Sequence, residues 1–338
     1  MRDEIRDARS ENEAQEMKPR KLVLIFLILK YLIGLFARMG KWLWQKRWWL
    51  CGLVVWAAVA WFLVRPLQPC GCLRVVMLDI GQGDSFVLDM PAGQKYLVDF
   101  SRGGLVVPAY QRYFGSFNRE IFQAIFTHPD LDHLGGSLAL LRQYIFRQVL
   151  GSWPKHEIVE VLALEKYWSD FGFTPAQAVG PKVISLGSDI SLELLWPQQD
   201  VRGVSTKNTN NQSIVFRLRY KKSAILFTGD AEAPVEKELL KQKINLQSDV
   251  LKVSHHGSKT GTSLEFLKAV SPKIALISAG LENRYGHPHT EVVKRLERAD
   301  IEIYRTDKGG DVVLESDGTA WKIVKLPLWQ KWQQWLIK

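Results

Sequence analysis

Side chains of the types that bind metal ions are concentrated in one short segment, Thr127-His128-Pro129-Asp130-Leu131-Asp132-His133, directly after an apolar run of β type. At a strand end that is followed by a helix, His128 and Asp130 can both bind one metal ion. Asp132 and His133, at the start of the helix, can reach a second metal ion nearby. The alternative is a solvated turn with an aspartate as helix N-cap, which leaves the two flanking histidines unexplained.

Three later segments place further candidate ligands at the ends of apolar runs. Leu226-Phe227-Thr228-Gly229-Asp230 delivers an acid from a buried strand, where a carboxylate needs a cation or hydrogen-bond donors. Capping of the helix from Pro234 is the alternative. Paired histidines follow in Val253-Ser254-His255-His256 and in Tyr285-Gly286-His287-Pro288-His289, and each pair could instead belong to an ordinary loop or turn. Position at the strand end favours His255 over His256 as a ligand.

Elements that can position these residues follow from hydrophobic periodicity and turn signals. Strands are predicted over 74–80, 85–90, 95–98, 124–126, 190–196, 214–220, 224–227, 250–253 and 274–278, and helices over 136–144, 234–241, 263–269 and 291–299. Residues 85–99 and 213–230 both have the pattern of a hairpin whose second strand ends in an aspartate. This predicts a β-hairpin unit used twice.

Together these segments resemble the metallo-β-lactamase fold. Asp99 matches its first motif, residues 128–133 its second, Asp230 its bridging acid and His255 its late histidine. The resemblance implies an α/β fold, a four-layer αββα sandwich, over residues 73–324.

A narrower resemblance, from about residue 74 to 324, is to the hydrolase domain of the ComEC competence-channel family. Its motifs here are Leu78-Asp79-Ile80-Gly81-Gln82-Gly83-Asp84-Ser85, Asn210-Asn211-Gln212-Ser213, Thr228-Gly229-Asp230-Ala231-Glu232, Lys252 to Ser258, and Tyr285 to His289. A full ComEC chain adds an oligonucleotide-binding-type domain and many membrane helices. This chain has at most two candidate spans and therefore resembles a detached, membrane-tethered relative of the hydrolase domain.

The resemblance implies two divalent metal ions. His128, Asp130 and Asp230 would hold one ion; the other would be held by Asp132, His133, His255 and the shared Asp230. The family's usual middle histidine is Asp130 here, and His156, in an unrelated Pro-Lys-His-Glu stretch, is no good candidate for the third histidine of the first site. The first site is therefore rich in oxygen, which favours Mn²⁺ or Mg²⁺ over Zn²⁺.

Roles for further residues are also implied by the resemblance. Asp99 would orient a ligand histidine. Asp132, besides binding metal, would be catalytic, and Asp84 would assist. His287 or His289 would donate a proton to the leaving alkoxide. Phosphate oxygens would be bound by Asn210, Asn211 and Ser258.

The net charge of +10 is concentrated at the ends of the chain. Residues 1–72 carry 12 Lys and Arg against 6 Asp and Glu, residues 325–338 carry 3 Lys and no acid, and residues 73–324 keep 30 basic against 29 acidic residues. A run without charge over 48–64 predicts a membrane span at the lower length limit. Residues 22–36, interrupted by Lys30, could span or lie in the interface. The first 72 residues are thus expected to form a tail and a membrane anchor.

The C-terminal segment 325–338 places Trp329, Trp332 and Trp335 three residues apart. This spacing makes one helical stripe and predicts an interfacial helix. Docking of the stripe on the protein's own core, or stacking on single-stranded bases, are the alternatives.

These observations predict a binuclear metal-dependent phosphodiesterase, first of all a DNA nuclease. DNA is the expected substrate, and membrane lipid and a DNA-uptake channel are the expected partners. Basic residues before the 48–64 span favour a hydrolase domain on the outer face of the cytoplasmic membrane. The alternatives are hydrolysis of a small or cell-surface phosphodiester such as phosphorylcholine, or a membrane-anchored binding module without catalysis.

Overall fold

The computed structural model describes residues 27–35, 52–57, 70–115, 119–187 and 189–325. The chain divides into two compact units, Met1–Arg65 and Pro66–Lys338, and each is described by itself. In the first unit, residues 27–35 and 52–57 are helical. Among the described helices, none is both long and apolar enough to cross a bilayer. Most of the predicted span 48–64, part of 22–36 and the tryptophan stripe of 326–338 lie outside the described residues.

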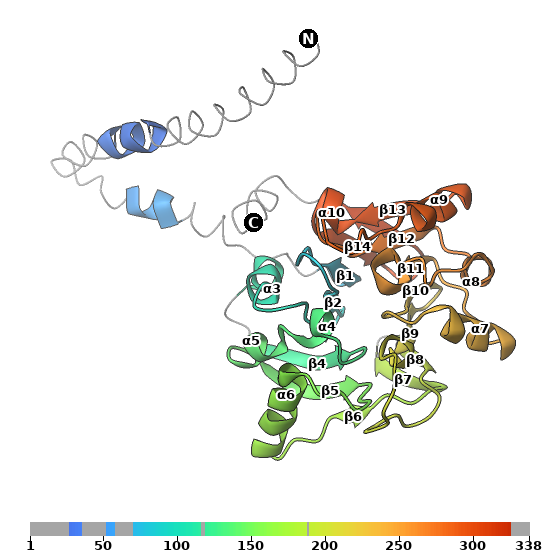
Figure 1. The fold of residues 1–338 in the computed structure, drawn as a ribbon. Helices are drawn as coiled ribbons and strands as arrows, with labels where there is room; N and C mark the ends of the chain where they lie inside the picture. Colours follow the sequence, from blue (N-terminus) through green and yellow to red (C-terminus); the bar gives the residue numbers. More distant parts are fainter. Residues whose placement is uncertain (1–26, 36–51, 58–69, 116–118, 188, 326–338) are drawn as a thin grey trace, which may run out of the picture. The chain divides into compact units, whose positions relative to one another are not determined.

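The second unit contains two mixed β-sheets (Figure 1). The first sheet has the order β15-β14-β1-β2-β3-β4-β5-β6. Pairing is antiparallel from β15 to β3 and parallel from β3 to β6. Its strands are β1 (Leu73–Met77), β2 (Phe86–Asp89), β3 (Lys95–Val98), β4 (Glu120–Phe126), β5 (Ile145–Gly151), β6 (Ala176–Gln177), β14 (Val312–Ser316) and β15 (Trp321–Val324).

The second sheet repeats this arrangement in the order β13-β12-β11-β10-β9-β8-β7. Pairing is antiparallel from β7 to β10 and parallel from β10 to β13. Its strands are β7 (Lys182–Gly187), β8 (Ile190–Trp196), β9 (Val215–Tyr220), β10 (Ser223–Phe227), β11 (Val250–Lys252), β12 (Ile274–Ile277) and β13 (Glu302–Arg305). The predicted repeat of a hairpin ending in an aspartate is confirmed, because β2–β3 and β9–β10 each pair antiparallel and lead into Asp99 and Asp230.

Alternation along the strands creates three hydrophobic layers, since successive side chains point to opposite faces. The inner faces of both sheets share one cluster, in which Phe86 of β2 meets Phe227 of β10 edge to face with ring centroids 5.3 Å apart. Phe216 of β9 stacks on Phe227 at 4.7 Å. The outer face of each sheet is covered by its own helices, through two further clusters. The predicted four-layer αββα sandwich is therefore confirmed.

The helices lie on the two outer sides of the paired sheets (Figure 1). The first sheet packs against α3 (Val106–Phe114), α4 (Leu131–Leu134), α5 (Ser137–Leu141) and α6 (Val159–Asp170). The second packs against α7 (Ala233–Lys241), α8 (Leu264–Val270) and α9 (Thr290–Arg298). The short α10 (Thr306–Gly309) and the 3-10 turns η1 (Asn210–Gln212) and η2 (Ser254–Gly257) connect strands. Because the parallel strands end at a common edge, the loops that follow them converge there.

Removal of an aromatic ring between the sheets tests the shared inner core. We expect Phe216→Ala to lower the free energy of unfolding by about 3–5 kcal/mol, because the fully buried ring leaves a cavity against Phe227. Urea denaturation of the metal-free protein measures this change. Phe171→Ala, at a ring that is 71% exposed, is the control and should change stability by at most about 0.5 kcal/mol. Equal losses in the two variants would contradict this core assignment.

Candidate metal centre

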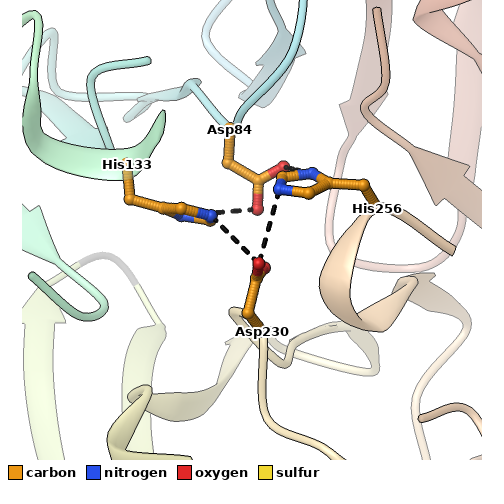
Figure 2. Close-up of side chains that lie close together, drawn as sticks. All are labelled: Asp84, His133, Asp230 and His256. Atoms are coloured by element: carbon orange, nitrogen blue, oxygen red, sulfur yellow. Dashed lines mark ion pairs between the residues drawn. The ribbon is translucent and has the colours of Figure 1, made fainter. Parts of the chain in front are cut away.

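Two histidines and two aspartates from four separate segments of the chain meet at the common edge of the sheets (Figure 2). Asp84 lies between β1 and β2, His133 in α4 after β4, Asp230 after β10, and His256 in η2 after β11. Each offers one ligand atom, and these four atoms lie within 4.8 Å of one another. The four residues are buried. Both halves of the sandwich therefore contribute to a single cluster.

Three buried histidines of this region share one pattern of contacts at their two ring nitrogens. Nδ1 of His133 lies 2.8 Å from Asp99 Oδ2, and Nδ1 of His256 lies 3.0 Å from the carbonyl oxygen of Ser278. Nδ1 of His128 lies 3.1 Å from Thr127 Oγ1. Within the described part of the chain, the Nε2 atom of each ring is buried without a hydrogen bond. An imidazole held through Nδ1 with a free Nε2 is the arrangement of metal-ligating histidines, so the donor set fits a metal ion.

Asp230 divides its two oxygens between a lysine and the histidines. Lys252, 1% exposed at the end of β11, has its ammonium 3.3 Å from Asp230 Oδ1 and donates to the Gly229 carbonyl at 2.7 Å. The same ammonium also pairs with Asp84. Asp230 Oδ2 faces Nε2 of His133 at 3.2 Å and Nε2 of His256 at 3.4 Å. Lys252 thus leaves one carboxylate oxygen of Asp230 directed at the free histidine nitrogens.

The buried acids of this region keep their charge. Burial raises the pKa of Asp230, but His133, His256 and Lys252 outweigh burial and hold this pKa well below its ordinary value. The pKa of Asp84 is lowered for the same reason, with Lys252 as the main opposing charge. Burial depresses the pKa of Lys252, and Asp84 and Asp230 raise it overall. The centre therefore holds ionised carboxylates at neutral pH, which is costly unless cations compensate them.

The neighbouring charges and burial shift the pKa values of the three histidines in different directions. For His256, burial opposes protonation, but the carboxylates of Asp230 and Asp84 outweigh burial and raise its pKa to about 10. Asp230 and Asp99 likewise outweigh burial and raise the pKa of His133 well above its ordinary value. Burial and the neighbouring His133 lower the pKa of His128. In the metal-free centre, protons on His133 and His256 partly supply the positive charge that a metal ion would bring.

The remaining acids of the 128–133 segment lie at the rim of this cluster. Asp132 Oδ2 is 3.4 Å from His256 Nε2, and Asp130 Oδ2 is 3.8 Å from His128 Nε2. Asp130 occupies the N-cap position of α4, but its side chain makes no capping hydrogen bond within the described residues. Instead, Asp130 Oδ1 accepts a hydrogen bond from Thr209 at 2.5 Å and lies 3.8 Å from Nε2 of His156. The structure thus brings His156, set aside on sequence, beside Asp130.

The tandem histidines of η2 both have left-handed backbones, with φ of 48° for His255 and 54° for His256. Such conformations are strained for residues other than glycine. His256 is buried in the cluster, whereas the side chain of His255 is 24% exposed and its Nε2 lies 3.8 Å from Asp230. Sequence position ranked His255 first. The structure gives His256 the shorter distance to Asp230 and the buried, free Nε2, and so favours His256 as the ligand.

The predicted phosphate-binding residues lie around His255. Asn210 Nδ2 is 3.4 Å from His255 Nδ1, and Ser258 Oγ accepts a hydrogen bond from Thr260 at 3.1 Å. Asn211 Oδ1 instead accepts from the Glu232 amide at 3.1 Å, so this oxygen holds the turn before α7. Asn210 and Ser258 therefore lie beside the cluster. The side-chain oxygen of Asn211 is already used to hold the turn before α7.

The late histidines form a second ring group next to the first. The ring of His287 lies 5.3 Å from that of His255 and 4.9 Å from that of His289, measured between centroids. Burial, together with the neighbouring histidines, lowers the pKa of His287 to about 4. His289 Nδ1 accepts a hydrogen bond from the Lys259 amide at 3.2 Å. At neutral pH His287 is therefore an uncharged imidazole, which weakens its predicted role as proton donor.

Two residues without a predicted role prove to be central. Lys252 interrupts the apolar run Val250-Leu251-Lys252-Val253, and a charge inside a buried strand was the available signal. The sequence carried no comparable signal for choosing between His255 and His256. Their side chains are 24% and 1% exposed in a turn where both residues have a left-handed backbone. Gly83, in the predicted Asp79–Asp84 motif, has φ of +121°, and a Cβ there would lie 2.1 Å from the Asp132 carbonyl oxygen. Only glycine therefore lets this loop approach the ligand segment.

Comparison with known proteins now decides the family. Residues 78–280 match the metallo-beta-lactamase superfamily. The chain belongs to this superfamily.

The chain is 32% identical over 263 residues to ComE operon protein 3 of Bacillus subtilis, covering 71% of this chain and 32% of that protein. To Competence protein ComA of Neisseria gonorrhoeae it is 32% identical over 241 residues, covering 70% and 31%. The predicted resemblance to ComEC-type competence proteins is confirmed, and the chain spans about a third of the length of these relatives.

The chain is also similar to a solved structure. CmlA of Streptomyces venezuelae, described as a diiron beta-hydroxylase, has a TM-score of 0.48 at 15% identity, covering 72% of this chain and 54% of that chain.

Substitution of each tandem histidine separates their roles. We expect His256→Ala to weaken Mn²⁺ or Zn²⁺ binding far more than His255→Ala does, because only His256 has a buried, free Nε2 facing Asp230. Isothermal titration calorimetry on the full-length protein measures both affinities. A larger loss in His255→Ala would restore the ranking that strand position suggests.

Metal binding should release protons. Since an imidazole must be neutral to bind metal, the pKa of about 10 for metal-free His256 predicts proton release near pH 7 and an affinity that rises with pH. Because the pKa is raised on folding, protonated His256 stabilises the metal-free fold fully below about pH 6.5. This stabilisation disappears as pH rises through about 10. Calorimetry in buffers of different ionisation enthalpy counts the protons, and a wild-type heat independent of buffer would refute this prediction.

Proposed function

We propose that this protein is a membrane-anchored, metal-dependent phosphodiester hydrolase of the ComEC type that acts on DNA. The observation that carries the proposal is the group of three buried histidines with free Nε2 atoms. Nε2 of His133 and of His256 faces the ionised carboxylate of Asp230. Nε2 of His128 faces Asp130. This donor set suits divalent cations better than it suits a purely structural role, because each Nε2 would otherwise be left buried and unsatisfied.

The residues that would hold metal follow from these contacts. His133, His256, Asp132 and one oxygen of Asp230 would form one site. His128 and Asp130 would form the other with a share of Asp230, and the oxygen-rich second set favours Mn²⁺ or Mg²⁺ there, with Zn²⁺ as the alternative. Bound divalent ions would acidify a water molecule and neutralise the charge of a phosphodiester.

Other side chains support this chemistry. Asp99 holds His133 through Nδ1, and Lys252 holds Asp230 through Oδ1. Asn210 and Ser258, beside His255, are the residues that we assign to phosphate oxygens. His289 remains the candidate to protonate the leaving oxygen, whereas His287, with its low pKa, is better suited to accept or donate a hydrogen bond as a neutral ring.

The proposal that DNA is the substrate rests on the names of the similar proteins. One of the two relatives described above is named Competence protein ComA, and the other is named ComE operon protein 3. We therefore propose a role in DNA uptake or processing, with an uptake channel and membrane lipid as partners. The near-neutral charge of residues 73–324 keeps a small or cell-surface phosphodiester such as phosphorylcholine as the second candidate, and a non-catalytic binding module as the third.

The proposed location is the outer face of the cytoplasmic membrane. The positive residues before the predicted span 48–64 favour an internal N-terminus. Cys70 and Cys72, directly before β1, form a disulfide. Disulfides persist mainly in oxidising compartments, which supports a hydrolase domain outside the cytoplasm.

Removal of a ligand tests the enzyme assignment. We expect Asp132→Ala and Asp230→Ala each to lower Mn²⁺-dependent cleavage of DNA by more than the roughly 10–100-fold that loss of a ligand's outer partner costs. Asp170→Ala, at an exposed aspartate of α6 paired with Lys166, is the matched control and should leave cleavage unchanged. Full-length protein is assayed on single-stranded DNA, duplex DNA and a phosphorylcholine ester.

Each outcome of this assay separates the candidates. Cleavage of the choline ester alone would favour the second candidate. Metal binding without turnover on any substrate would favour the third. Unchanged DNA cleavage in either ligand variant would remove the metal assignment itself.

A further inference from the structure

A cavity of about 600 Å³ opens beside the metal centre. It lies among the loop after β5, helix α6 and the loop after β8. Its lining includes Trp153, Lys155, His156, Leu162, Trp168 and Arg202. The volume is within the range of cavities that take small ligands, roughly 300–1,000 Å³. None of the roles proposed above uses this cavity.

One lining residue of the cavity, His156, lies close to a proposed metal ligand. Nε2 of this lining residue lies 3.8 Å from Asp130 Oδ1. The neighbouring loops are tied together, because the Lys155 amide donates to the Val204 carbonyl and the Gly203 amide donates to the Trp153 carbonyl, both at 2.9 Å. A ligand in the cavity would therefore be adjacent to a group bound at Asp130.

One wall of the cavity is a fixed aromatic surface. The indole of Trp153 contacts Trp168 edge to face at 4.9 Å and Phe126 at 5.3 Å, and its Nε1 donates to the Ala176 carbonyl at 3.2 Å. A Cβ on Gly151 would lie 2.2 Å from this indole, so the ring needs glycine there. The orientation of Trp153 is thus determined before any ligand binds.

The mouth of the cavity carries charges of both signs, Lys155 and Arg202 together with Glu157 and Glu165. Lys155 is exposed, with a side chain 58% accessible, and Arg202 is exposed as well. Glu157 at the same mouth already pairs with Lys155 at 2.9 Å. An apolar aromatic wall with cations at its mouth suits a ligand that has a flat ring and a phosphate.

We propose that this cavity binds the base of the nucleotide next to the phosphodiester held at the metal centre. The base would pack against the Trp153 wall, and Lys155 and Arg202 would contact the following phosphate. A base enters such a cavity only when it is unstacked, so the substrate class is single-stranded nucleic acid. This inference rests on the proposed function and specifies its substrate.

Binding in EDTA tests the proposal without requiring hydrolysis. The full-length protein is titrated with a short oligothymidylate and with a fully abasic strand of the same length. We expect the wild type to prefer the intact strand by roughly tenfold or more, since one stacked base contributes on this scale. Trp153→Leu should reduce binding of the intact strand to the abasic level. Lys155→Ala should weaken both strands, because it contacts phosphate.

Two further variants keep the test decisive. Leu162→Trp adds bulk at an exposed lining position, and it should block the preference for bases even if Trp153→Leu fails to fold. Phe171→Leu removes an exposed ring of the same region outside the cavity lining and should leave both affinities unchanged. Unfolding is monitored by circular dichroism.

The outcomes distinguish this inference from the proposed function. Metal-dependent DNA cleavage without any preference for the intact strand, or a preference that survives both Trp153→Leu and Leu162→Trp, overturns the base site alone. Displacement of the strand by phosphorylcholine also overturns it. A preference for bases that depends on Trp153 in a protein that cleaves no DNA supports the cavity assignment and rejects the nuclease.

Discussion

Buried negative charge at the common edge of the two sheets is the constraint on which the rest of the structure depends. Asp84, Asp99 and Asp230 are each at most 2% exposed, and Lys252 is the buried cation that contacts two of them. Carboxylates at such depth are stable only beside cations and donors. Protonated histidines meet this need in part in the absence of metal, and divalent ions would meet it more fully.

Lys252 also connects the two halves of the sandwich. It extends from β11 of the second sheet, yet it pairs with Asp84 from the loop between the first two strands. Replacing only this lysine would remove a buried cation from two buried carboxylates, a loss that typically costs about 3–5 kcal/mol. The arrangement of ligands and the packing of the sheets are therefore not independent properties.

Sequence patterns predicted much of this architecture, and physical reasons explain where they failed. Strands such as β3 and β8 have the predicted bounds, because alternation and turn residues are local signals. Helix α6 and strand β5 were missed; α6 has only weakly segregated apolar residues, and β5 has exposed positions among buried ones. The segments of the site were recognised from residue type. The preference for His256, the pairing of Lys252 and the position of His156 depend on contacts between distant loops, which spacing along the chain does not encode.

The origin of the ligands from both halves of the chain has a consequence for biosynthesis. Asp84, His128 and His133 emerge from the ribosome well before Asp230 and His256. A nascent chain with only the first half carries an incomplete donor set, because Lys252 and His256, which both pair with Asp84, follow in the second half. Under the proposed ligand assignment, capture of metal and any hydrolytic activity that depends on it would therefore be postponed until translation has passed η2 and the second sheet has closed on the first.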